Sequence, residues 1–325
     1  MSPEPSATAA AATLDQPVFD EVAALAARGQ VARSIFRLTF QAPRIARLAK
    51  PGQFVNIMVP SPGFGYRVHD RWPPAIEGSR PFLLRRPFSI YDADPDAGEI
   101  AVLVRVVGEG TRALSRLAVR ERVKVLGPLG RGFDLPPPGA AALLVAGGCG
   151  WASLGLLARQ LARRGNPTYA FIGAATTDEL PVETTQRVID QNHPLADRLP
   201  RVCVTAAELE NLGITVGLAA EEGGNLYGGV VTDLLEHFLA SPRARGAWIF
   251  ACGPWAMLAR VAELARDARN HCQVALEEMM ACGMGVCNSC VVEVLEPDGS
   301  LGHRKLCTDG PVLDAAIVNW DRAPR

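Results

Sequence analysis

Four cysteines near the C-terminus have a spacing that suits an iron–sulfur cluster. Cys282, Cys287 and Cys290 are separated by gaps of four and two residues, and sixteen residues lie between Cys290 and Cys307. Four thiolates hold a [2Fe–2S] cluster, and this spacing is typical of plant-type ferredoxins. The first gap contains two glycines, which let the backbone curl around a cluster and offer amides to its sulfurs. A structural zinc site is the alternative, but its ligands more often form two CxxC pairs.

A glycine-rich turn between an apolar strand and a helix is the second candidate site. Its residues are Gly147, Gly148, Cys149 and Gly150. Glycines let the backbone approach a pyrophosphate, and the N-terminus of the following helix favours its negative charge. The turn lacks the G-x-G-x-x-G spacing, so an ordinary strand–helix turn is the alternative. Because ligands bind at the carboxyl ends of parallel strands, this turn is expected to share one crevice with a later strand end, Cys252-Gly253-Pro254.

A third candidate site combines an arginine in a strand with the start of a helix. The strand carries Arg86, whose planar guanidinium can pair with a phosphate. Thr111, which follows Gly110, is predicted to cap a short helix over residues 112–117 and so to create a second place for an anion. Taken alone, an arginine beside a proline in a strand is more often simple surface charge.

Composition excludes several classes of protein. The chain has 325 residues, of which 48% are apolar and 21% charged, so it can form two or three domains with a sizeable core. A net charge of -1 leaves no electrostatic footprint for nucleic acid. Eight cysteines without a secretion signal favour a cluster or metal in a reducing cytoplasm, with Cys149, Cys203 and Cys272 as buried small hydrophobes. An uncharged stretch, 135–158, is long enough to span a bilayer, but its prolines and glycines argue against a membrane protein.

The elements that must position these sites fall into two patterns. Short strands separated by glycine or proline predict a small antiparallel barrel or sandwich, at 35–40, 53–59, 87–91, 100–107 and 122–126. Strands that alternate with helices then predict a doubly wound parallel sheet, with strands at 142–146, 169–173, 202–205, 214–216 and 248–251 and helices at 153–164, 232–239 and 255–267. The expected division is a disordered tail (1–18), a barrel (19–135), an α/β domain (136–270) and a small cysteine module (271–325). Residues 61–80 read as a long loop within the barrel.

Together and in this order, the three candidate sites resemble the ferredoxin-reductase-like flavoproteins. They are most similar to the electron-transfer subunits of NAD-dependent (class B) dihydroorotate dehydrogenase. The resemblance covers about residue 30 to the end, and its last segment is the most specific. The segments that carry it are LRRPFSI (84–90), GEGT (108–111), GPLG (127–130), AGGCG (146–150), GGVVTD (228–233), CGP (252–254) and LEEMMACGMGVC (276–287).

The resemblance assigns cofactors to these residues. FAD-binding positions of the family fall on Arg86, Pro87, Phe88, Ser89, Leu103, Val104, Arg105, Gly110 and Thr111. Arg86 would neutralise the pyrophosphate, and Ser89 would lie near the flavin ring. NAD-binding positions fall on Gly147, Gly148, Cys149, Gly150, Gly253 and Pro254. Cys252 would lie near the nicotinamide, where hydride passes between NAD and flavin N5, and the four C-terminal cysteines would hold the [2Fe–2S] cluster.

The chain departs from the family pattern at several of these positions. Phe88 stands where relatives often have tyrosine, and Ser153 stands where the glycine turn usually closes with proline. Asn288-Ser289, between two cluster ligands, is more polar than expected. Ala175 occupies a position where relatives often carry arginine, and without a cation there NAD is favoured over NADP.

The function implied by the resemblance is one half of an enzyme. A partner subunit, an FMN-containing dihydroorotate dehydrogenase, would oxidise dihydroorotate in pyrimidine biosynthesis, and its electrons would reach NAD⁺ through the cluster and FAD. Two copies of each subunit are expected, forming a heterotetramer that binds neither nucleic acid nor membrane. One alternative is a reductase subunit that serves a hydrogenase, a ferredoxin or a glutamate synthase. The alternative from another class is a non-catalytic, zinc-stabilised binding module.

Overall fold

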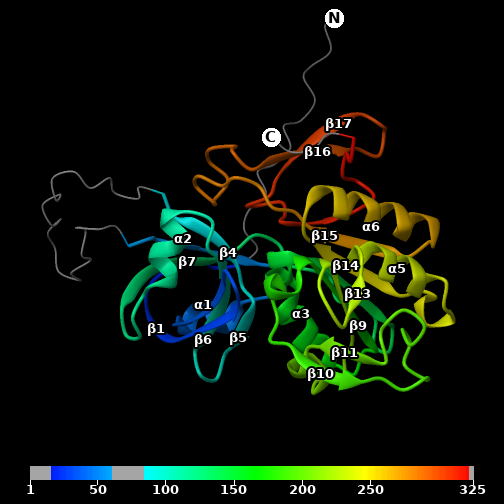
Figure 1. Ribbon diagram of the computed structural model, residues 1–325. Coiled ribbons are helices and arrows are strands. Elements are labelled where there is room, and N and C mark those ends of the chain that lie inside the picture. The colour runs from blue at the N-terminus through cyan, green and yellow to red at the C-terminus, as the bar shows by residue number, and fades with distance from the viewer. Residues whose placement is uncertain (1–15, 61–83, 322–325) are drawn as a thin grey trace, which may run out of the picture.

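The structure is a computed structural model that describes residues 16–60 and 84–321. The predicted disordered tail, apart from residues 16–18, and the predicted loop at 61–80 lie outside the described residues. Figure 1 shows two domains side by side, a barrel in blue to cyan and an α/β domain in green to yellow. The orange-to-red C-terminal segment lies along one side of both.

The first domain is an antiparallel barrel of seven strands in the order β4-β3-β7-β1-β2-β6-β5. Alternate residues of its strands point inward, and Ile100, Val102 and Val104 are fully buried in the barrel core. The elements of this domain are β1 (Phe19–Ala32), β2 (Ile35–Gln41), α1 (Pro43–Leu48), β3 (Phe54–Ile57), β4 (Arg86–Ser89), β5 (Asp92–Asp94), β6 (Glu99–Arg105), α2 (Glu109–Ser115) and β7 (Arg122–Leu129). The predicted antiparallel barrel is therefore confirmed, although β1 had not been expected.

The second domain is built on a seven-stranded sheet in the order β13-β12-β9-β8-β14-β15-β18. All neighbouring pairs are parallel except β15 with β18. Its elements are β8 (Ala142–Gly147), η1 (Gly148–Gly150), α3 (Trp151–Arg163), β9 (Thr168–Thr176), η2 (Thr177–Glu179), β12 (Thr215–Glu222), β13 (Tyr227–Gly228), α5 (Val231–Leu239), η3 (Pro242–Ala244), β14 (Trp248–Cys252), α6 (Trp255–Asp267), β15 (His271–Ala275) and β18 (Val312–Asp314).

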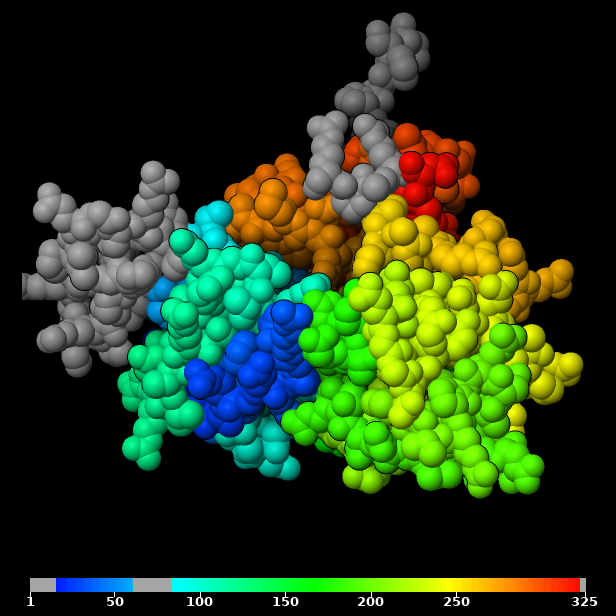
Figure 2. Space-filling model, viewed as in Figure 1, coloured from blue at the N-terminus to red at the C-terminus, as the bar shows by residue number. Residues whose placement is uncertain are grey.

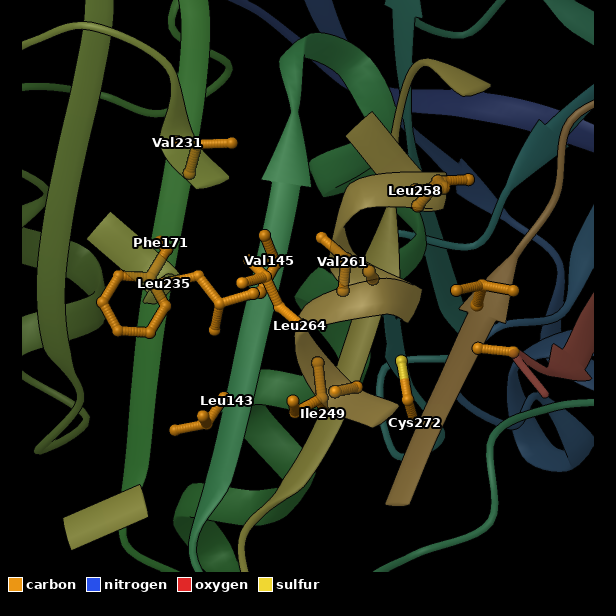
Figure 3. Close-up of a cluster of buried hydrophobic side chains, with 14 of the residues drawn as sticks. Leu143, Val145, Phe171, Val231, Leu235, Ile249, Leu258, Val261, Leu264 and Cys272 are labelled. Carbon is orange, nitrogen blue, oxygen red and sulfur yellow. The ribbon is translucent and has the colours of Figure 1, made fainter. Parts of the chain in front are cut away.

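Helices cover both faces of this sheet, which makes it doubly wound as predicted. Leu143 and Val145 of β8 pack with side chains of α5 and α6 in one cluster (Figure 3). The alternate residues Leu144 and Ala146 point to the other face and pack against α3. Strands that are buried on both faces read as continuous apolar runs, which is why β8 and β14 were recognised from the sequence.

Two features of the second domain differ from the sequence prediction. The strand at 202–205, β11 (Val202–Thr205), was expected in the parallel sheet but pairs with β10 (Thr185–Val188) in a separate antiparallel ribbon. That prediction is wrong because β12 already lies between β9 and β13, which leaves no place for another strand there. A short helix, α4 (Ala207–Glu210), follows this ribbon. The parallel sheet also includes β15 and β18, so it extends beyond the expected domain boundary at residue 270.

The C-terminal segment leaves the sheet at the end of β15 and returns to it as β18. Between them lie the cluster loop, defined as residues 276–290, and a hairpin of β16 (Val291–Leu295) and β17 (Leu301–Lys305). No helix in the described part of the chain is long and apolar enough to cross a membrane. The uncharged stretch 135–158 instead contains β8, η1 and the first half of α3.

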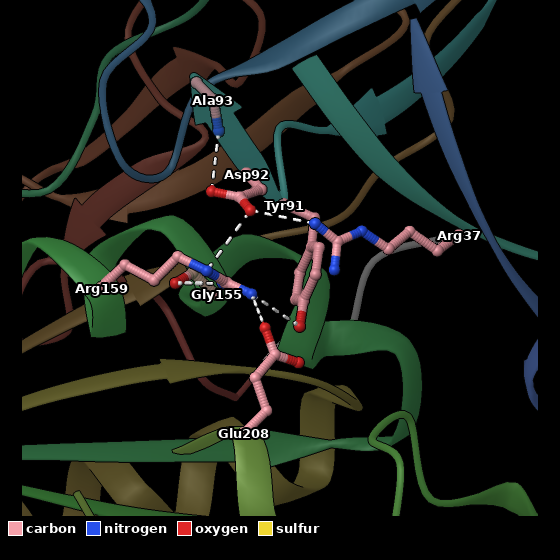
Figure 4. A network of polar contacts seen from close by, with 7 residues as sticks. All are labelled: Arg37, Tyr91, Asp92, Ala93, Gly155, Arg159 and Glu208. Carbon is pink, nitrogen blue, oxygen red and sulfur yellow. Dashed lines mark hydrogen bonds and ion pairs between the residues drawn. The ribbon is translucent and has the colours of Figure 1, made fainter. Parts of the chain in front are cut away.

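A buried ion network joins the barrel to the α/β domain (Figure 4). Arg159 of α3 contacts the carboxylate of Asp92 on β5 at 3.3 Å, pairs with Glu208 of α4 and lies over the ring of Tyr91. Gly155 allows this close approach, because a Cβ there would lie 2.3 Å from the Tyr91 ring. The two domains are thus packed directly against each other beside the crevice that separates them.

Candidate functional site

A cavity of ≈ 500 Å³ lies in the crevice between the two domains. We call it the flavin cavity. The barrel contributes the wall formed by Pro87, Phe88, Ser89, Leu103, Arg105 and Thr111, and the α/β domain contributes Gly147, Cys149, Gly150, Ser153, Gly253 and Pro254. Predicted residues from both domains therefore come together around one space. Its aromatic and apolar walls, with a few polar groups and glycine turns, fit a flavin nucleotide.

A second cavity of ≈ 500 Å³ adjoins the first on the side of the parallel sheet. We call it the nucleotide cavity. It shares Arg105, Gly147, Cys149 and Pro254 with the flavin cavity. Two ligands bound in these cavities would therefore meet at the glycine turn. This arrangement fits NAD beside FAD.

The two glycine turns pack against each other without room for side chains. A Cβ on Gly150 would lie 2.3 Å from the carbonyl oxygen of Cys252, and one on Gly253 would lie 2.8 Å from the amide nitrogen of Gly147. Gly253 also has a φ of +158°, which favours glycine. The prediction that both turns line one crevice is confirmed by this geometry.

Some residues assigned by the resemblance do not line the flavin cavity. Val104 points into the barrel core, because it alternates with Leu103 and Arg105 along β6. Arg86 donates to the carbonyl oxygen of Leu84 at 2.8 Å and lies beside the cavity. Its Nε is 3.8 Å from where a Cβ on Gly110 would lie, so the arginine and the turn at 110 are neighbours.

The helix expected to begin after Thr111 begins two residues earlier than that threonine. Gly108 is the N-cap of α2, and Thr111 is the third helical residue. Its hydroxyl oxygen accepts hydrogen bonds from the amides of Val107 and Gly108 at 3.0 and 3.2 Å. The predicted cap is therefore wrong, because the hydroxyl reaches back to the turn instead of starting the helix. Thr111 still lines the flavin cavity.

A chain of polar side chains crosses the crevice behind the cavity walls. The hydroxyls of Ser89 and Ser153 are 2.8 Å apart, and the Cys252 thiol lies 3.4 Å from the Ser153 hydroxyl. Glu277 is next, with its carboxylate oxygen 4.0 Å from the Cys252 sulfur. Cys252 lines neither cavity, since its thiol is buried behind Ser153.

Burial keeps the two thiols of this crevice protonated. It raises the pKa of Cys149 to about 12, and the negative charge of Glu277 adds to the effect. Burial also raises the pKa of Cys252 well above the usual value for a thiol. Desolvation by the surrounding walls raises the pKa of Glu277 as well. At neutral pH both cysteines are therefore thiols, which can donate hydrogen bonds but are poor nucleophiles.

The four predicted cluster ligands form two pairs. Cys282 and Cys287 are linked, because the amide of Cys287 donates to the Cys282 sulfur at 3.4 Å. Cys290 and Cys307 share a hydrogen bond between their thiols. Among the residues that the structure describes, no three His, Cys, Asp or Glu side chains converge on one point as they would around a single metal ion. Two pairs suit a cluster of two irons, each held by two thiolates, better than one tetrahedral zinc.

Backbone amides of the cluster loop point at these sulfurs. The amide of Met284 donates to Cys282 at 3.5 Å, and that of Gly285 donates to Cys307 at 3.1 Å. Hydrogen bonds from Ser289 lower the pKa of Cys287 to about 6, and the bond with Cys307 lowers the pKa of Cys290 to about 6. The same bond raises the pKa of Cys307, so it favours one thiolate in this pair. Because the thiolate is the metal ligand, this environment fits an iron–sulfur cluster.

Asn56 connects the cluster loop to the barrel. It is buried on β3, and its side-chain amide donates to the carbonyl oxygen of Cys282 at 3.3 Å. Gly283 leaves room for this contact, because a Cβ there would lie 2.0 Å from the Asn56 nitrogen. The residues just before Cys282 also form part of the flavin cavity, namely Leu276, Glu277, Glu278 and Met280. The cluster loop is thus one wall of the flavin cavity.

Comparison with known proteins agrees with this geometry. The family model described as iron-sulfur cluster binding domain of dihydroorotate dehydrogenase B matches residues 277–319. Over 291 residues the chain is 32% identical to the dihydroorotate dehydrogenase B (NAD(+)), electron transfer subunit of Desulforamulus reducens, covering 90% of this chain and 95% of that protein. A subunit of the same name from Geobacillus thermodenitrificans is 34% identical over 290 residues, with 89% and 94% covered.

The chain belongs to this family of electron-transfer subunits. It is a subunit of an iron–sulfur flavoprotein oxidoreductase. Its cofactors are FAD and a [2Fe–2S] cluster, and NAD is its nicotinamide substrate. Members of this family are named electron transfer subunits of a dehydrogenase, which implies that each acts with a catalytic partner subunit.

Solved structures show the same fold at lower identity. An NADH-dependent reduced ferredoxin-NADP oxidoreductase has a TM-score of 0.69 at 24% identity, with 93% of this chain and 91% of that chain covered. Phthalate dioxygenase reductase, a modular structure for electron transfer from pyridine nucleotides to [2Fe–2S], has a TM-score of 0.51 at 16% identity, with 88% and 76% covered. The expected combination of a flavin-binding barrel, a nucleotide-binding α/β domain and a C-terminal cluster module is confirmed.

Several residues of the site were not found from the sequence. Glu277 and Glu278 stand five and four residues before Cys282, and that proximity was the available signal. Ser153 was noted as a departure from the family pattern, but its contacts with two other elements had no local signature. Asn56 gave no signal, because its partner lies 226 residues away along the chain.

Proposed function

We propose that this protein is the electron-transfer subunit of an NAD-dependent dihydroorotate dehydrogenase in pyrimidine biosynthesis. Electrons released by oxidation of dihydroorotate in a partner subunit pass through this chain to NAD⁺. The observation that carries the proposal is that the segment leading into Cys282 also walls the flavin cavity, through Leu276 and Met280 among others. One short segment thus spans the distance between the cluster ligands and the place where flavin and nicotinamide meet.

Each part of the chain has a distinct task in this proposal. Bound FAD supplies the exchange between a two-electron hydride and single electrons. Phe88 and Leu103 form apolar walls for its ring, while Ser89 offers a hydroxyl at the same wall. The glycine turn from Gly147 to Gly150 lets the NAD pyrophosphate approach the backbone. Ala175 lines the nucleotide cavity where relatives often carry arginine. The arginines that do line this cavity, Arg105 and Arg260, are already ion-paired with glutamates, which supports NAD over NADP.

The partner subunit is proposed to dock over the exposed end of the cluster loop. Cys287 is the exposed member of the four cysteines, and the large apolar side chains around it are also exposed: Met279 by 81%, Val286 by 76% and Met284 by 49%. Exposed apolar groups of this kind mark interaction sites, and methionine adapts well to a partner surface. In Figure 2 the orange surface of this segment adjoins the cyan surface of the barrel. An FMN-containing catalytic subunit fits this face, and two copies of each subunit form the proposed heterotetramer.

A cytoplasmic location follows from the same proposal. All eight cysteines are free, and the cluster ligands have to remain reduced until iron is bound. Free thiols of this number persist in a reducing compartment.

The deciding experiment is an anaerobic absorbance spectrum of the complex isolated from its native host. Addition of dihydroorotate is expected to bleach the flavin and cluster bands, and NAD⁺ is expected to restore them. If NADH bleaches the bands and dihydroorotate does not, the chain is a reductase subunit with another partner and the pyrimidine role is wrong. A colourless protein would contradict the flavoprotein reading as a whole.

A matched pair of variants tests whether electrons from dihydroorotate enter the protein through the cluster. Cys287→Ser is expected to lose electron transfer from dihydroorotate while FAD remains bound and is still reduced by NADH. Cys203→Ser changes a buried cysteine on β11 that lines neither cavity, and is expected to retain both reactions. Undiminished transfer from dihydroorotate in Cys287→Ser would count against the cluster as the entry point.

A further inference from the structure

Ser153 occupies a junction between three elements of the fold. It is the third residue of α3, its side chain is 3% exposed, and it lies on the wall of the flavin cavity. Its hydroxyl is 2.8 Å from the hydroxyl of Ser89 on β4 and 3.4 Å from the thiol of Cys252 at the end of β14. Ser153 therefore joins the barrel wall of the crevice to the sheet wall through hydrogen bonds.

We propose that Ser153 is a positioning residue that holds Ser89 and Cys252 in place where the flavin and nucleotide cavities meet. The assignment of flavin and NAD to those cavities rests on the proposed function, whereas the hydrogen bonds that link Ser89, Ser153 and Cys252 are independent of it. A hydroxyl suits this position because it can accept one hydrogen bond and donate another at the same time. Alanine and proline could do neither, and Cys252 would keep the more distant Glu277 oxygen, 4.0 Å away, as its polar neighbour.

The hydrogen-bonded series ends at Cys252 on one side and at the flavin cavity on the other. Cys252 is a buried thiol, and its two polar neighbours are the Ser153 hydroxyl at 3.4 Å and a Glu277 carboxylate oxygen at 4.0 Å. The Ser153 hydroxyl accepts from the Cys252 thiol and shares with Ser89 a hydrogen bond that either hydroxyl can donate. Ser89 lines the flavin cavity, so Ser153 restricts the orientation of a hydroxyl at the wall where the ring binds.

The first test measures the hydrogen bond of the Cys252 thiol by infrared spectroscopy. Thiol S–H stretching bands lie in a spectral window that is free of other protein bands, and the Cys252 band is identified by its absence in Cys252→Ala. In Ser153→Ala this band is expected to move to a higher frequency, because the remaining neighbour of the thiol, a Glu277 oxygen at 4.0 Å, lies farther away than the lost hydroxyl at 3.4 Å. Ser115→Ala is the matched control, because Ser115 is 6% exposed and its hydroxyl donates to the Arg112 carbonyl within α2. An unmoved Cys252 band in Ser153→Ala would overturn the proposal.

The second test is the rate of flavin reduction by NADH, followed by stopped flow. Ser153→Ala is expected to slow this step about tenfold, because hydride transfer depends on the alignment of both walls, while the Kd for NAD⁺ changes less than about twofold. Ser115→Ala is expected to leave both values unchanged. A rate equal to that of the unmodified protein in Ser153→Ala would refute the positioning role.

The two readouts also separate this inference from the proposed function. Neither the infrared band nor reduction by NADH requires dihydroorotate or the partner subunit. If dihydroorotate fails to reduce the complex but both Ser153→Ala effects are observed, the partner assignment fails and the positioning role stands.

Discussion

Cysteines in the crevice and cysteines in the cluster loop have pKa values that are shifted in different ways. In the crevice, burial raises the pKa of Cys149 to about 12 and that of Cys252 further above its usual value. In the cluster loop, hydrogen bonds from neighbouring groups lower the pKa of Cys287 and Cys290 to about 6, and the pKa of Cys307, which holds the shared proton of its pair with Cys290, is raised. Buried thiols with apolar surroundings are inert, whereas thiols that receive hydrogen bonds are ready to ligate metal.

This difference shows why spacing alone identified one set of cysteines and not the other. Three of the four cluster ligands lie in one short loop whose own backbone amides donate to the cysteine sulfurs. The local sequence pattern was therefore enough to predict most of the cluster site. The environment of Cys252 depends on Ser153 and Glu277, which come from other parts of the chain. The contrast can be tested by changing each region separately.

The largest expected effect is loss of the cluster in Cys290→Ala. This change removes one thiol of the buried Cys290–Cys307 pair, so the cluster absorbance and its electron paramagnetic resonance signal should disappear. Electron transfer from the partner is expected to fall by about 100-fold or more. Reduction of FAD by NADH is expected to persist. Cys203→Ala, a change at another buried cysteine, should leave both properties intact, and loss of FAD binding in Cys290→Ala would show that the two regions are not separable.

The reverse experiment disturbs the crevice and spares the cluster. In Gly150→Ala the new methyl group would lie 2.3 Å from the Cys252 carbonyl oxygen, so the two glycine turns must separate. We expect a loss of about 2 kcal/mol in the free energy of unfolding and weaker NAD⁺ binding, with an unchanged cluster signal. Gly29→Ala is the matched control, since no atom lies within 4 Å of the added methyl group. Denaturant titration and fluorescence binding measure the two effects, and wild-type NAD⁺ affinity in Gly150→Ala would contradict the close packing described here.

A smaller effect is expected where the cluster loop meets the barrel. Gly283 and Gly299 have φ values of +70° and +81°, so alanine at either position carries the same backbone strain. At Gly283 the methyl group would also collide with Asn56, whereas at Gly299 nothing lies within 4 Å. Gly283→Ala is therefore expected to destabilise the protein by about 1 kcal/mol more than Gly299→Ala. Equal unfolding midpoints would mean that the Asn56 contact does not hold the loop.

The extent of prediction from sequence follows the same division between local and distant contacts. The strands of the parallel sheet were visible because burial on both faces makes them continuously apolar, and α6 was predicted with its observed bounds, residues 255–267. The 14-residue strand β1 was missed because its many alanines and exposed polar residues hide the alternation. The ribbon strand β11 was assigned to the wrong sheet because a strand of four residues does not reveal its partner.

Within the site, residues that belong to motifs were easier to predict than the contacts that orient them. The glycine turn and the Cys252 turn were predicted to meet, and they do. Val104 was assigned to the cofactor by its place in a motif, yet strand alternation turns its side chain into the barrel core. The role of Thr111 as a helix cap failed because hydrogen bonds to the preceding turn, rather than residue preference, decided where α2 begins.

The smallest predicted effect concerns a buried cysteine outside both cavities. Burial raises the pKa of Cys272 on β15 from 9.0 to about 12. Below pH 9 both folded and unfolded chains hold this proton, and above pH 9 the unfolded chain loses it first, so stability decreases as the pH rises. Between pH 8 and pH 9.5 this group alone is expected to remove up to about 1 kcal/mol from the free energy of unfolding. In Cys272→Ala the decrease measured by urea titration should be smaller by that amount, and identical pH profiles would show that Cys272 is not held as a buried thiol.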